Sequence, residues 1–312
     1  MSTAGALPPE LRGRVFRGTD AVSSGAIGRS LLRGPAVHRL FRDCFADSSL
    51  PVDHVLRCRA LGLVLPPGAV LVGVSAAAMH GVQWVEAEDP VHVAVPHPHP
   101  WGARTGVVVS RAQVRVAEIT VQSGIRVATR ERVLLDLAAR PVEPAESMVL
   151  VDAALARWPV LERQREDLLA GWAGRRGCHR ARAVLALADG RSQSPMESRL
   201  RAHLLLGGLP PAEAQWVVRD HGGRFVARVD LAWPDRCLAV EYDGRWHGRT
   251  DEQFSADRRR LDALTAAGWR VVHVTRVGVD RGWPEVVHTI RQAWQQTRRP
   301  GIEQPRPVLR SA

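Results

Sequence analysis

The sequence predicts an α/β protein, of mixed α+β type overall, with more than one domain. Three observations support this prediction. The chain has 312 residues, whereas a domain usually has ~100 to 200. Segments with apolar residues at helical spacing alternate with short runs rich in valine and isoleucine, which suit strands. Near the C-terminus, two apolar runs flank Pro234-Asp235-Arg236, which is the pattern of a β-hairpin.

The composition excludes several classes of protein. Hydrophobic residues make up 45% of the chain and charged residues 24%, as in ordinary globular proteins. No run of ~18 apolar residues predicts a membrane span, and residues 1–10 lack the basic and apolar stretches of a signal peptide. The four cysteines are scattered without the paired spacing of zinc sites, so we expect reduced thiols. Together these features predict a cytoplasmic protein.

The chain is strongly basic. Its formal net charge is +11 at pH 7, and every one of its 43 lysine-or-arginine positions is an arginine. Such a charge favours a polyanionic partner, and DNA is the partner that we expect. The chain is also rich in alanine, glycine, valine and proline and has no asparagine, which is typical of a GC-rich genome. Coding bias therefore accounts for part of the basicity.

Residues 1–50 predict a winged helix-turn-helix. Residues 17–25 have the pattern of a short capped helix that a glycine ends, and residues 26–33 that of a second helix before Gly34-Pro35. Residues 37–45 then alternate as a strand or wing. In such a module the second helix enters the major groove of DNA. The cations expected to face DNA are Arg29, Arg33, Arg39 and Arg42.

This order of elements resembles the N-terminal module of AbiEi-type antitoxins, in which a winged helix precedes a mixed α/β domain. The resemblance implies that residues 1–50 contact DNA. The alternative interpretation is a small docking module whose arginines form a solvated face.

Residues 51–190 predict a mixed α/β region with a helical linker, and they resemble the α/β portion of the same family. Pro66-Pro67-Gly68 separates the first two helices, and Ser123-Gly124 has the composition of a hairpin turn. The predicted helices are residues 51–61, 74–81, 129–139, 146–158 and 161–189. The predicted strands are residues 91–95, 106–110 and 118–129. No reaction can be named for this region.

Two features of this region have competing interpretations. The arginine-rich residues 161–189 suit either a groove that tracks a nucleic-acid backbone or a solvated linker helix, and we favour the linker. His97-Pro98-His99 lacks an obvious third ligand, so we interpret it as a surface loop and not as a metal site.

Residues 191–296 contain acidic side chains at positions where strands rarely have them. Asp230 lies within the first strand of the predicted hairpin, and Glu241 and Asp243 lie near the end of the second. The alternation of a strand puts Glu241 and Asp243 on one face, where the neighbouring strand can bring Asp230 beside them. Because a buried carboxylate needs compensation, this arrangement predicts a site for a hard cation such as Mg²⁺, with Mn²⁺ as a substitute.

The surrounding segments extend this pattern. Ser194 and Pro195 predict the N-cap and first residue of a helix with Glu197 in its first turn. The full set of elements, in order, is Ser194-Pro195-Met196-Glu197, Asp230, Glu241, Asp243-Gly244 with Trp246-His247, Asp257-Arg258-Arg259, and Gly268-Trp269-Arg270-Val271-Val272. Their order and spacing resemble the Vsr-like branch of the PD-(D/E)xK nuclease superfamily. The resemblance implies a restriction-endonuclease-like mixed sheet flanked by helices.

The resemblance also implies roles for these residues. Asp230 is expected to be the central metal ligand and Glu241 a second ligand, directly or through its carbonyl or a water. Glu197 is expected to be an outer-sphere or second-metal contact. Asp243 and His247 are the candidates for proton transfer. The remaining expected site residues are Asp257, which orients His247, and Arg258 and Arg259, which clamp phosphates. The chain has no lysine, so it lacks the superfamily's usual lysine at position 243, as the Vsr-like branch does, and the general base is left open.

The sequence therefore predicts a Mg²⁺-dependent DNA endonuclease with three domains, residues 1–50, 51–190 and 191–296, and a disordered arginine-containing tail, residues 297–312. The main alternative is a non-catalytic DNA-binding regulator, similar to an antitoxin, whose nuclease fold has lost turnover. Two blander alternatives concern the acids themselves. In the first, the acids form a surface-exposed hairpin end and pair with local arginines. In the second, Glu197 serves only as a capping-box partner of Ser194.

Overall fold

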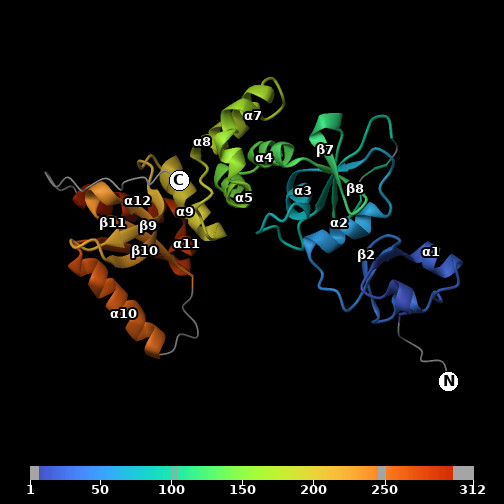
Figure 1. Cartoon of the computed structure of the whole chain (residues 1–312), viewed down its shortest axis with the longest axis horizontal. Coiled ribbons are helices and arrows are strands. Elements are labelled where there is room, and N and C mark those ends of the chain that lie inside the picture. Colours follow the sequence, from blue (N-terminus) through green and yellow to red (C-terminus); the bar gives the residue numbers. More distant parts are fainter. Residues whose placement is uncertain (1–6, 100, 103, 245–250, 298–312) are drawn as a thin grey trace. The chain divides into compact units, whose positions relative to one another are not determined.

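The computed structural model describes residues 7–99, 101–102, 104–244 and 251–297. It is a mixed α/β protein, as predicted, and these residues form three sheets (Figure 1). The chain forms two compact units. The first runs to Pro141 and includes Ala153–Ala183, and the second consists of Val142–Asp152 and the chain from Val184 onward. Among the described helices, none has the length and apolar character needed to traverse a lipid bilayer.

The first unit begins with a three-stranded antiparallel sheet of order β1-β3-β2. Its elements are the 3-10 turn Pro9–Leu11, β1 (Val15–Arg17), α1 (Gly18–Ser23), the 3-10 turn Leu31–Arg33, β2 (Val37–Phe41) and β3 (Cys44–Asp47). Phe16 and Phe45 stack with ring centroids 6.1 Å apart, and Ile27 is buried beside them. This small core fixes the loop after α1 against the sheet.

The predicted second helix at residues 26–33 is wrong, because only Leu31–Arg33 is helical there, as one 3-10 turn. Gly25, just after α1, has φ of +75°, a left-handed conformation that does not continue into a helix. Burial of Ile27 in the sheet core holds this segment in its irregular path. The strand or wing predicted over residues 37–45 is a hairpin of β2 and β3, with Asp43 at φ of +64° in its turn.

The first unit also contains a five-stranded mixed sheet of order β6-β5-β4-β8-β7. Its strands are β4 (Val70–Leu71), β5 (Val91–Ala94), β6 (Val107–Ser110), β7 (Ile119–Gln122) and β8 (Ile125–Ala128), and its helices are α2 (His54–Gly62), α3 (Gly73–Met79) and α4 (Arg130–Ala138). The predicted hairpin is confirmed, since Ser123 and Gly124 both have positive φ between β7 and β8. Thr129 caps α4 through its side chain. The two-residue strand β4 was not predicted.

Four helices follow in the chain: α5 (Pro144–Arg157), α6 (Val160–Arg163), α7 (Arg165–Gly171) and α8 (Cys178–Leu187). The prediction of one continuous helix over residues 161–189 is therefore wrong. Gly174 and Gly177 have φ of +76° and +83°, a conformation that no helix interior accepts, and they separate α7 from α8.

The second unit contains a four-stranded mixed sheet of order β12-β11-β10-β9. Its strands are β9 (Glu213–Arg219), β10 (Phe225–Trp233), β11 (Leu238–Asp243) and β12 (Arg270–Thr275). The predicted hairpin is confirmed: β10 and β11 are antiparallel and joined by the 3-10 turn Pro234–Arg236. The strand predicted to start at Gly268-Trp269-Arg270 is confirmed as β12, which is parallel to β11. Strand β9 was not predicted.

Helices cover both faces of this sheet (Figure 1). On one face, α9 (Pro195–Leu206) and α12 (Trp283–Gln296) pack on Leu231, Leu238 and Val240, with the short α11 (Arg276–Arg281) nearby. On the other face, α10 (Asp251–Ala266) packs through Leu264 on Ala239. Strand β11 therefore lies between two layers of helices.

A buried ion pair anchors α9 within this unit. Arg201 of α9 contacts Asp152 at 2.5 Å, and their side chains are 4% and 0% exposed. The same carboxylate accepts a hydrogen bond from the Asp189 backbone N–H at 2.8 Å. Burial raises the pKa of Asp152, and the Arg201 guanidinium opposes that rise. The pair joins α5, the segment before α9, and α9 itself.

Candidate functional site

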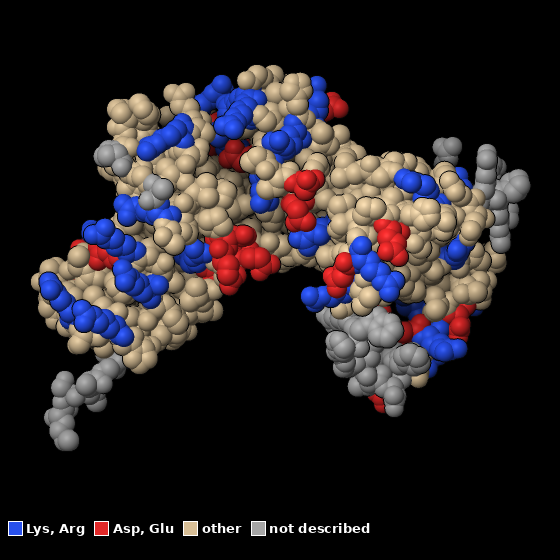
Figure 2. Space-filling model, turned by 180° about the vertical axis from the view of Figure 1, so that it is seen from behind, with Lys and Arg blue, Asp and Glu red and all other residues tan. Residues whose placement is uncertain are grey.

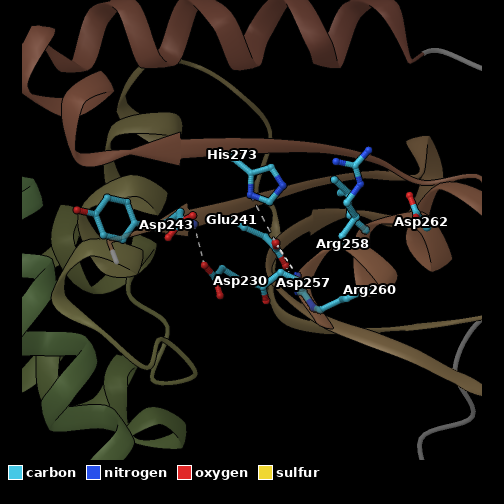
Figure 3. A pocket seen from close by; sticks show the side chains of 10 residues that line it. Asp230, Glu241, Asp243, Asp257, Arg258, Arg260, Asp262 and His273 are labelled. Carbon is cyan, nitrogen blue, oxygen red and sulfur yellow. Dashed lines mark hydrogen bonds and ion pairs between the residues drawn. The ribbon is translucent and has the colours of Figure 1, made fainter. Parts of the chain in front are cut away.

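The acidic residues of β10 and β11 face one cavity of about 610 Å³ beside α10. Figure 3 shows Asp230, Glu241 and Asp243 gathered at the sheet, with Asp257, Arg258 and Arg260 approaching from α10. The cavity is lined by Asp230, Glu241, Tyr242, Asp243, Asp257, Arg258, Arg260, Leu261, Asp262 and His273. Asp230 and Glu241 thus point to the same side of the sheet, as the strand alternation predicted.

Asp230 is held by the main chain of the neighbouring strand. The backbone N–H of Tyr242 donates to Asp230 Oδ2 at 2.9 Å, and Oδ1 has no hydrogen-bond partner in the described part of the chain. Burial raises the pKa of Asp230 to about 6, and the charges of Glu197 and Glu241 add to that rise, against the Tyr242 hydrogen bond and Arg260. At neutral pH the carboxylate is a negative charge that its surroundings disfavour, which is the environment of a cation ligand.

Glu241 is paired with an arginine that the sequence did not single out. Arg260 of α10 binds both carboxylate oxygens, with Nη1 at 2.9 Å from Oε2 and Nη2 on Oε1, and Nη2 also donates to the Arg228 carbonyl oxygen at 3.0 Å. Glu241 is only 8% exposed. The interpretation of the acids as a surface-exposed hairpin end is therefore wrong for Glu241, although its pairing with a local arginine is confirmed.

Of the two arginines of α10 predicted to clamp phosphates, Arg258 and Arg259, only the first lies at the cavity. Arg258 lines the cavity, whereas Arg259 does not and is exposed. Leu264 is the buried anchor of this helix, and counting back four and seven residues gives Arg260 and Asp257 on the same face. That helical spacing was present in the sequence and could have identified Arg260.

His273 of β12 was also missed. It is opposite Glu241 in the parallel register, and its Nδ1 lies 3.9 Å from Glu241 Oε2. Its neighbours Val272 and Val274 belong to the core on the opposite face, so the alternation of β12 turns His273 towards the cavity. A polar residue inside an otherwise apolar strand was the signal.

Glu197 lies outside the lining of the cavity but influences it. The Ser194 N-cap is confirmed, since Ser194 Oγ accepts from the Glu197 backbone N–H at 3.2 Å. Glu197 Oε2 accepts from the Gln193 backbone N–H at 2.9 Å and from Gln215 Nε2 at 2.8 Å. The Glu197 side chain thus accepts from the backbone N–H of Gln193 and not from that of Ser194, so the two residues do not form a capping box. Through its charge, Glu197 raises the pKa of Asp230.

Only some of these residues are suited to binding a divalent ion. Asp230 has one carboxylate oxygen without a hydrogen-bond partner in the described residues, whereas both oxygens of Glu241 are bound by Arg260. Within residues 7–99, 101–102, 104–244 and 251–297, no group of three or more His, Cys, Asp or Glu side chains is arranged to hold a metal ion. His247, the expected proton-transfer residue, and its predicted contact with Asp257 lie outside the described residues.

The arginines predicted to contact DNA lie in the N-terminal part of the first unit. Arg29, Arg33, Arg39 and Arg42 are all exposed, and no acidic side chain in the described ranges pairs with them. Figure 2 shows basic side chains gathered on this part of the molecule. None of the four is on an α-helix: Arg33 is in a 3-10 turn, Arg39 is in β2, and the other two are in turns.

Comparison with known proteins gives relatives but no activity. No protein-family model matches the chain. Two uncharacterised proteins of Mycobacterium tuberculosis, Rv2248 and MT2308, are each 35% identical to it over 172 residues, which is 55% of this chain and 59% of each relative. The chain thus spans about three fifths of the curated relatives that it matches. The crystal structure of the Rv2827c protein of the same species is 18% identical with a TM-score of 0.37, covering 66% of this chain and 83% of that one.

Proposed function

We propose that the C-terminal unit is a divalent-cation-dependent DNA endonuclease of the PD-(D/E)xK superfamily, close to the Vsr-like branch, acting in the cytoplasm. The observation that carries this proposal is Asp230, a largely buried carboxylate that lines one cavity together with Glu241, Asp243 and Arg258. The helix-sheet-helix sandwich of this unit supports a restriction-endonuclease-like fold.

The proposed chemistry assigns Asp230 as the residue that would hold Mg²⁺ or Mn²⁺, with Asp243 as its neighbour in the cavity. A bound ion of this kind polarises a phosphoryl oxygen and lowers the pKa of a water. Tyr242 fixes the orientation of Asp230 through its backbone N–H. Glu197 adds negative charge that favours a cation at Asp230.

The remaining residues of the cavity serve substrate binding and proton transfer in this proposal. Arg258 offers a guanidinium fork whose geometry matches phosphate oxygens. Asp243 is the acceptor that we assign to the proton of the attacking water, since the chain has no lysine for that role. In this proposal, an aspartate thus replaces the lysine of the superfamily pattern as the general base.

The N-terminal part of the first unit is proposed to engage DNA through its phosphates. Five exposed arginines there have no acidic partner in the described ranges, which suits contact with a polyanion that does not depend on sequence. They are Arg14, Arg29, Arg33, Arg39 and Arg42. The α1 helix and the β2–β3 hairpin support the winged-helix and AbiEi-like assignment, while the lack of a second α-helix before β2 weakens it.

A second candidate function has its own support. Arg260 binds both oxygens of Glu241, a carboxylate that a nuclease would need for its ion. Such pairing is expected of a degenerate site. The protein would then be a DNA-binding regulator, similar to an antitoxin, without turnover.

Nicking of supercoiled plasmid distinguishes the two. With Mg²⁺ or Mn²⁺ we expect nicked circles, no nicking with EDTA, and loss of nicking in Asp230→Asn while DNA binding is retained. Asp235→Asn, at an exposed acid in the turn between β10 and β11, is the matched control and should nick like the wild type. DNA binding without nicking under either metal would favour the regulator.

A further inference from the structure

Arg260 occupies the position at which Glu241 would meet a cation. Its two terminal nitrogens bind the two oxygens of Glu241, and that carboxylate is nearly enclosed. Figure 3 shows the guanidinium reaching Glu241 from the α10 side of the cavity. Each oxygen keeps a further lone pair, but an ion bound there would lie next to a fixed positive charge, and the two would repel.

The same guanidinium has a second possible partner. A phosphate presents two oxygens at nearly the spacing of a carboxylate, so the fork that holds Glu241 also suits a phosphodiester. Arg258 lines the same cavity two residues earlier, so a phosphate drawn into the cavity would meet both arginines. The Arg260 side chain is 35% exposed, which leaves its guanidinium a path to such a phosphate.

We propose that Arg260 exchanges Glu241 for a DNA phosphate, and that this exchange releases Glu241 to bind the divalent ion. The inference rests on the proposed nuclease function and deepens it. Ion binding and DNA binding are then coupled, because each favours the arrangement in which Arg260 has left Glu241. By linkage, DNA raises the affinity for the ion by the same factor by which the ion raises the affinity for DNA.

The coupling follows from the charges of the cavity. Without DNA, Arg260 supplies the positive charge that the carboxylates require, and an incoming ion must displace it. With DNA, the phosphate takes the arginine and its own negative charge adds to the attraction for the ion. The protein would therefore hold its metal weakly until substrate is present.

The test measures Mn²⁺ binding by titration calorimetry on the full chain, with and without a DNA duplex whose phosphorothioate linkages resist cleavage. For the wild type we expect weak Mn²⁺ binding that strengthens at least ~5-fold when the duplex is present. For Arg260→Met we expect tight binding without the duplex and no further strengthening with it. Arg259→Met is the matched control on the same helix, since Arg259 does not line the cavity, and it should behave as the wild type.

Different outcomes would reject different parts of the proposal. Equal wild-type affinity with and without bound duplex would overturn the exchange and leave the nuclease proposal standing. Absence of Mn²⁺ binding in both samples would overturn both. Since Arg260→Met leaves a nearly buried Glu241 without its partner, circular dichroism must show a folded protein, and Arg260→Gln, which keeps one donor, serves as a second variant. Failure of both variants to exceed the wild-type affinity without duplex would also overturn the exchange.

Discussion

The backbone N–H of Tyr242 donates a hydrogen bond of 2.9 Å to the carboxylate of Asp230, so a side chain of β10 is oriented by the main chain of β11. The hydrogen bond falls one residue beyond Glu241, at the point where the acidic residues of the two strands meet. The donor belongs to Tyr242, so a substitution at residue 230 leaves it in place, and an oxygen at that position keeps its orientation when its charge is changed. This property makes Asp230 a suitable position at which to separate charge from geometry.

We predict that Asp230→Asn stabilises the protein while abolishing the proposed nicking activity. Asn retains an oxygen for the Tyr242 N–H but carries no charge into a buried position. The folded pKa of Asp230 is about 6, above the ordinary 3.8, so the folded state binds the proton more tightly than the unfolded state does. The wild type therefore loses stability as pH rises from 3.8 through about 6, and the loss is complete above that window.

Above pH ~6, Asp230→Asn should raise the free energy of unfolding by about 1 to 2 kcal/mol, after allowance for the solvent that reaches this carboxylate. The difference between variant and wild type should vanish towards the lower end of the pH window. Urea denaturation at a series of pH values measures it. A variant that is destabilised at every pH would show that the carboxylate is held by favourable contacts, contrary to the raised pKa.

Gln215 provides a second test of the site. It has φ of +53°, a left-handed conformation that a non-glycine residue adopts at a cost, and its amide reaches Glu197 at 2.8 Å. Gln215→Gly should relieve the backbone cost, leaving the unfolding free energy within ~1 kcal/mol of the wild type. It should also slow nicking several-fold, because Glu197 loses one of its two donors.

Gln193→Gly is a poor control for that hydrogen bond because Gln193 bonds Glu197 through its backbone, so Gln215→Asn is preferred. Asn tolerates the left-handed conformation but is shorter by one methylene and should not reach Glu197. Equal nicking rates for the wild type, Gln215→Gly and Gln215→Asn would show that the hydrogen bond from Gln215 to Glu197 has no influence on the reaction.

The buried pair of Arg201 and Asp152 gives a stability prediction independent of function. Arg201→Met leaves the Asp152 carboxylate buried without its partner and should cost about 3 to 5 kcal/mol. Arg191→Met removes an exposed partner of Asp189 and should cost ~1 kcal/mol or less. Urea denaturation followed by circular dichroism compares them. Arg201→Met combined with Asp152→Leu should recover part of the stability, and equal costs for the two single variants would contradict the assigned burial.

The sequence predicted the parts of the site that follow from strand alternation. Asp230, Glu241 and Asp243 were placed on one face because side chains of a strand alternate and the hairpin turn was recognisable. Arg260 was overlooked because an Arg-Arg-Arg run gives no helical phase by itself, and the spacing of four residues from the apolar Leu264, which the sequence contains, was not used. His273 depended on the parallel pairing of β11 with β12, which joins residues that are distant in the chain.

The errors elsewhere have a similar origin. Residues 26–33 have a helical composition, but Ile27 is drawn into the core beneath β2 and β3, which no local pattern reveals. In residues 161–189 the positive φ angles of Gly174 and Gly177 outweigh the helical spacing of their neighbours. Tertiary burial in the first case, and backbone conformation in the second, overrode local propensity.

The exposed arginines of residues 7–50 lead to the last prediction, that their removal weakens DNA binding uniformly across sequences. Each phosphate that the protein no longer neutralises should lower the slope of log affinity against log salt by ~0.9 for duplex DNA. Replacing Arg29, Arg33, Arg39 and Arg42 by Gln should therefore reduce that slope by up to ~4 and leave nicking by the C-terminal unit measurable at low salt. Fluorescence anisotropy with labelled duplexes at several salt concentrations measures the slope.

The matched control for this prediction lies in the helical linker, which we interpret as a solvated segment. It replaces Arg163, Arg165, Arg176 and Arg182 by Gln, so it removes the same number of positive charges, and it should leave the slope unchanged. The comparison separates the effect of net charge from the effect of position, because both variants have the same formal charge. A fall in the slope for the linker variant, but not for the N-terminal one, would place the DNA-binding surface on the linker and reverse our assignment of these two basic segments.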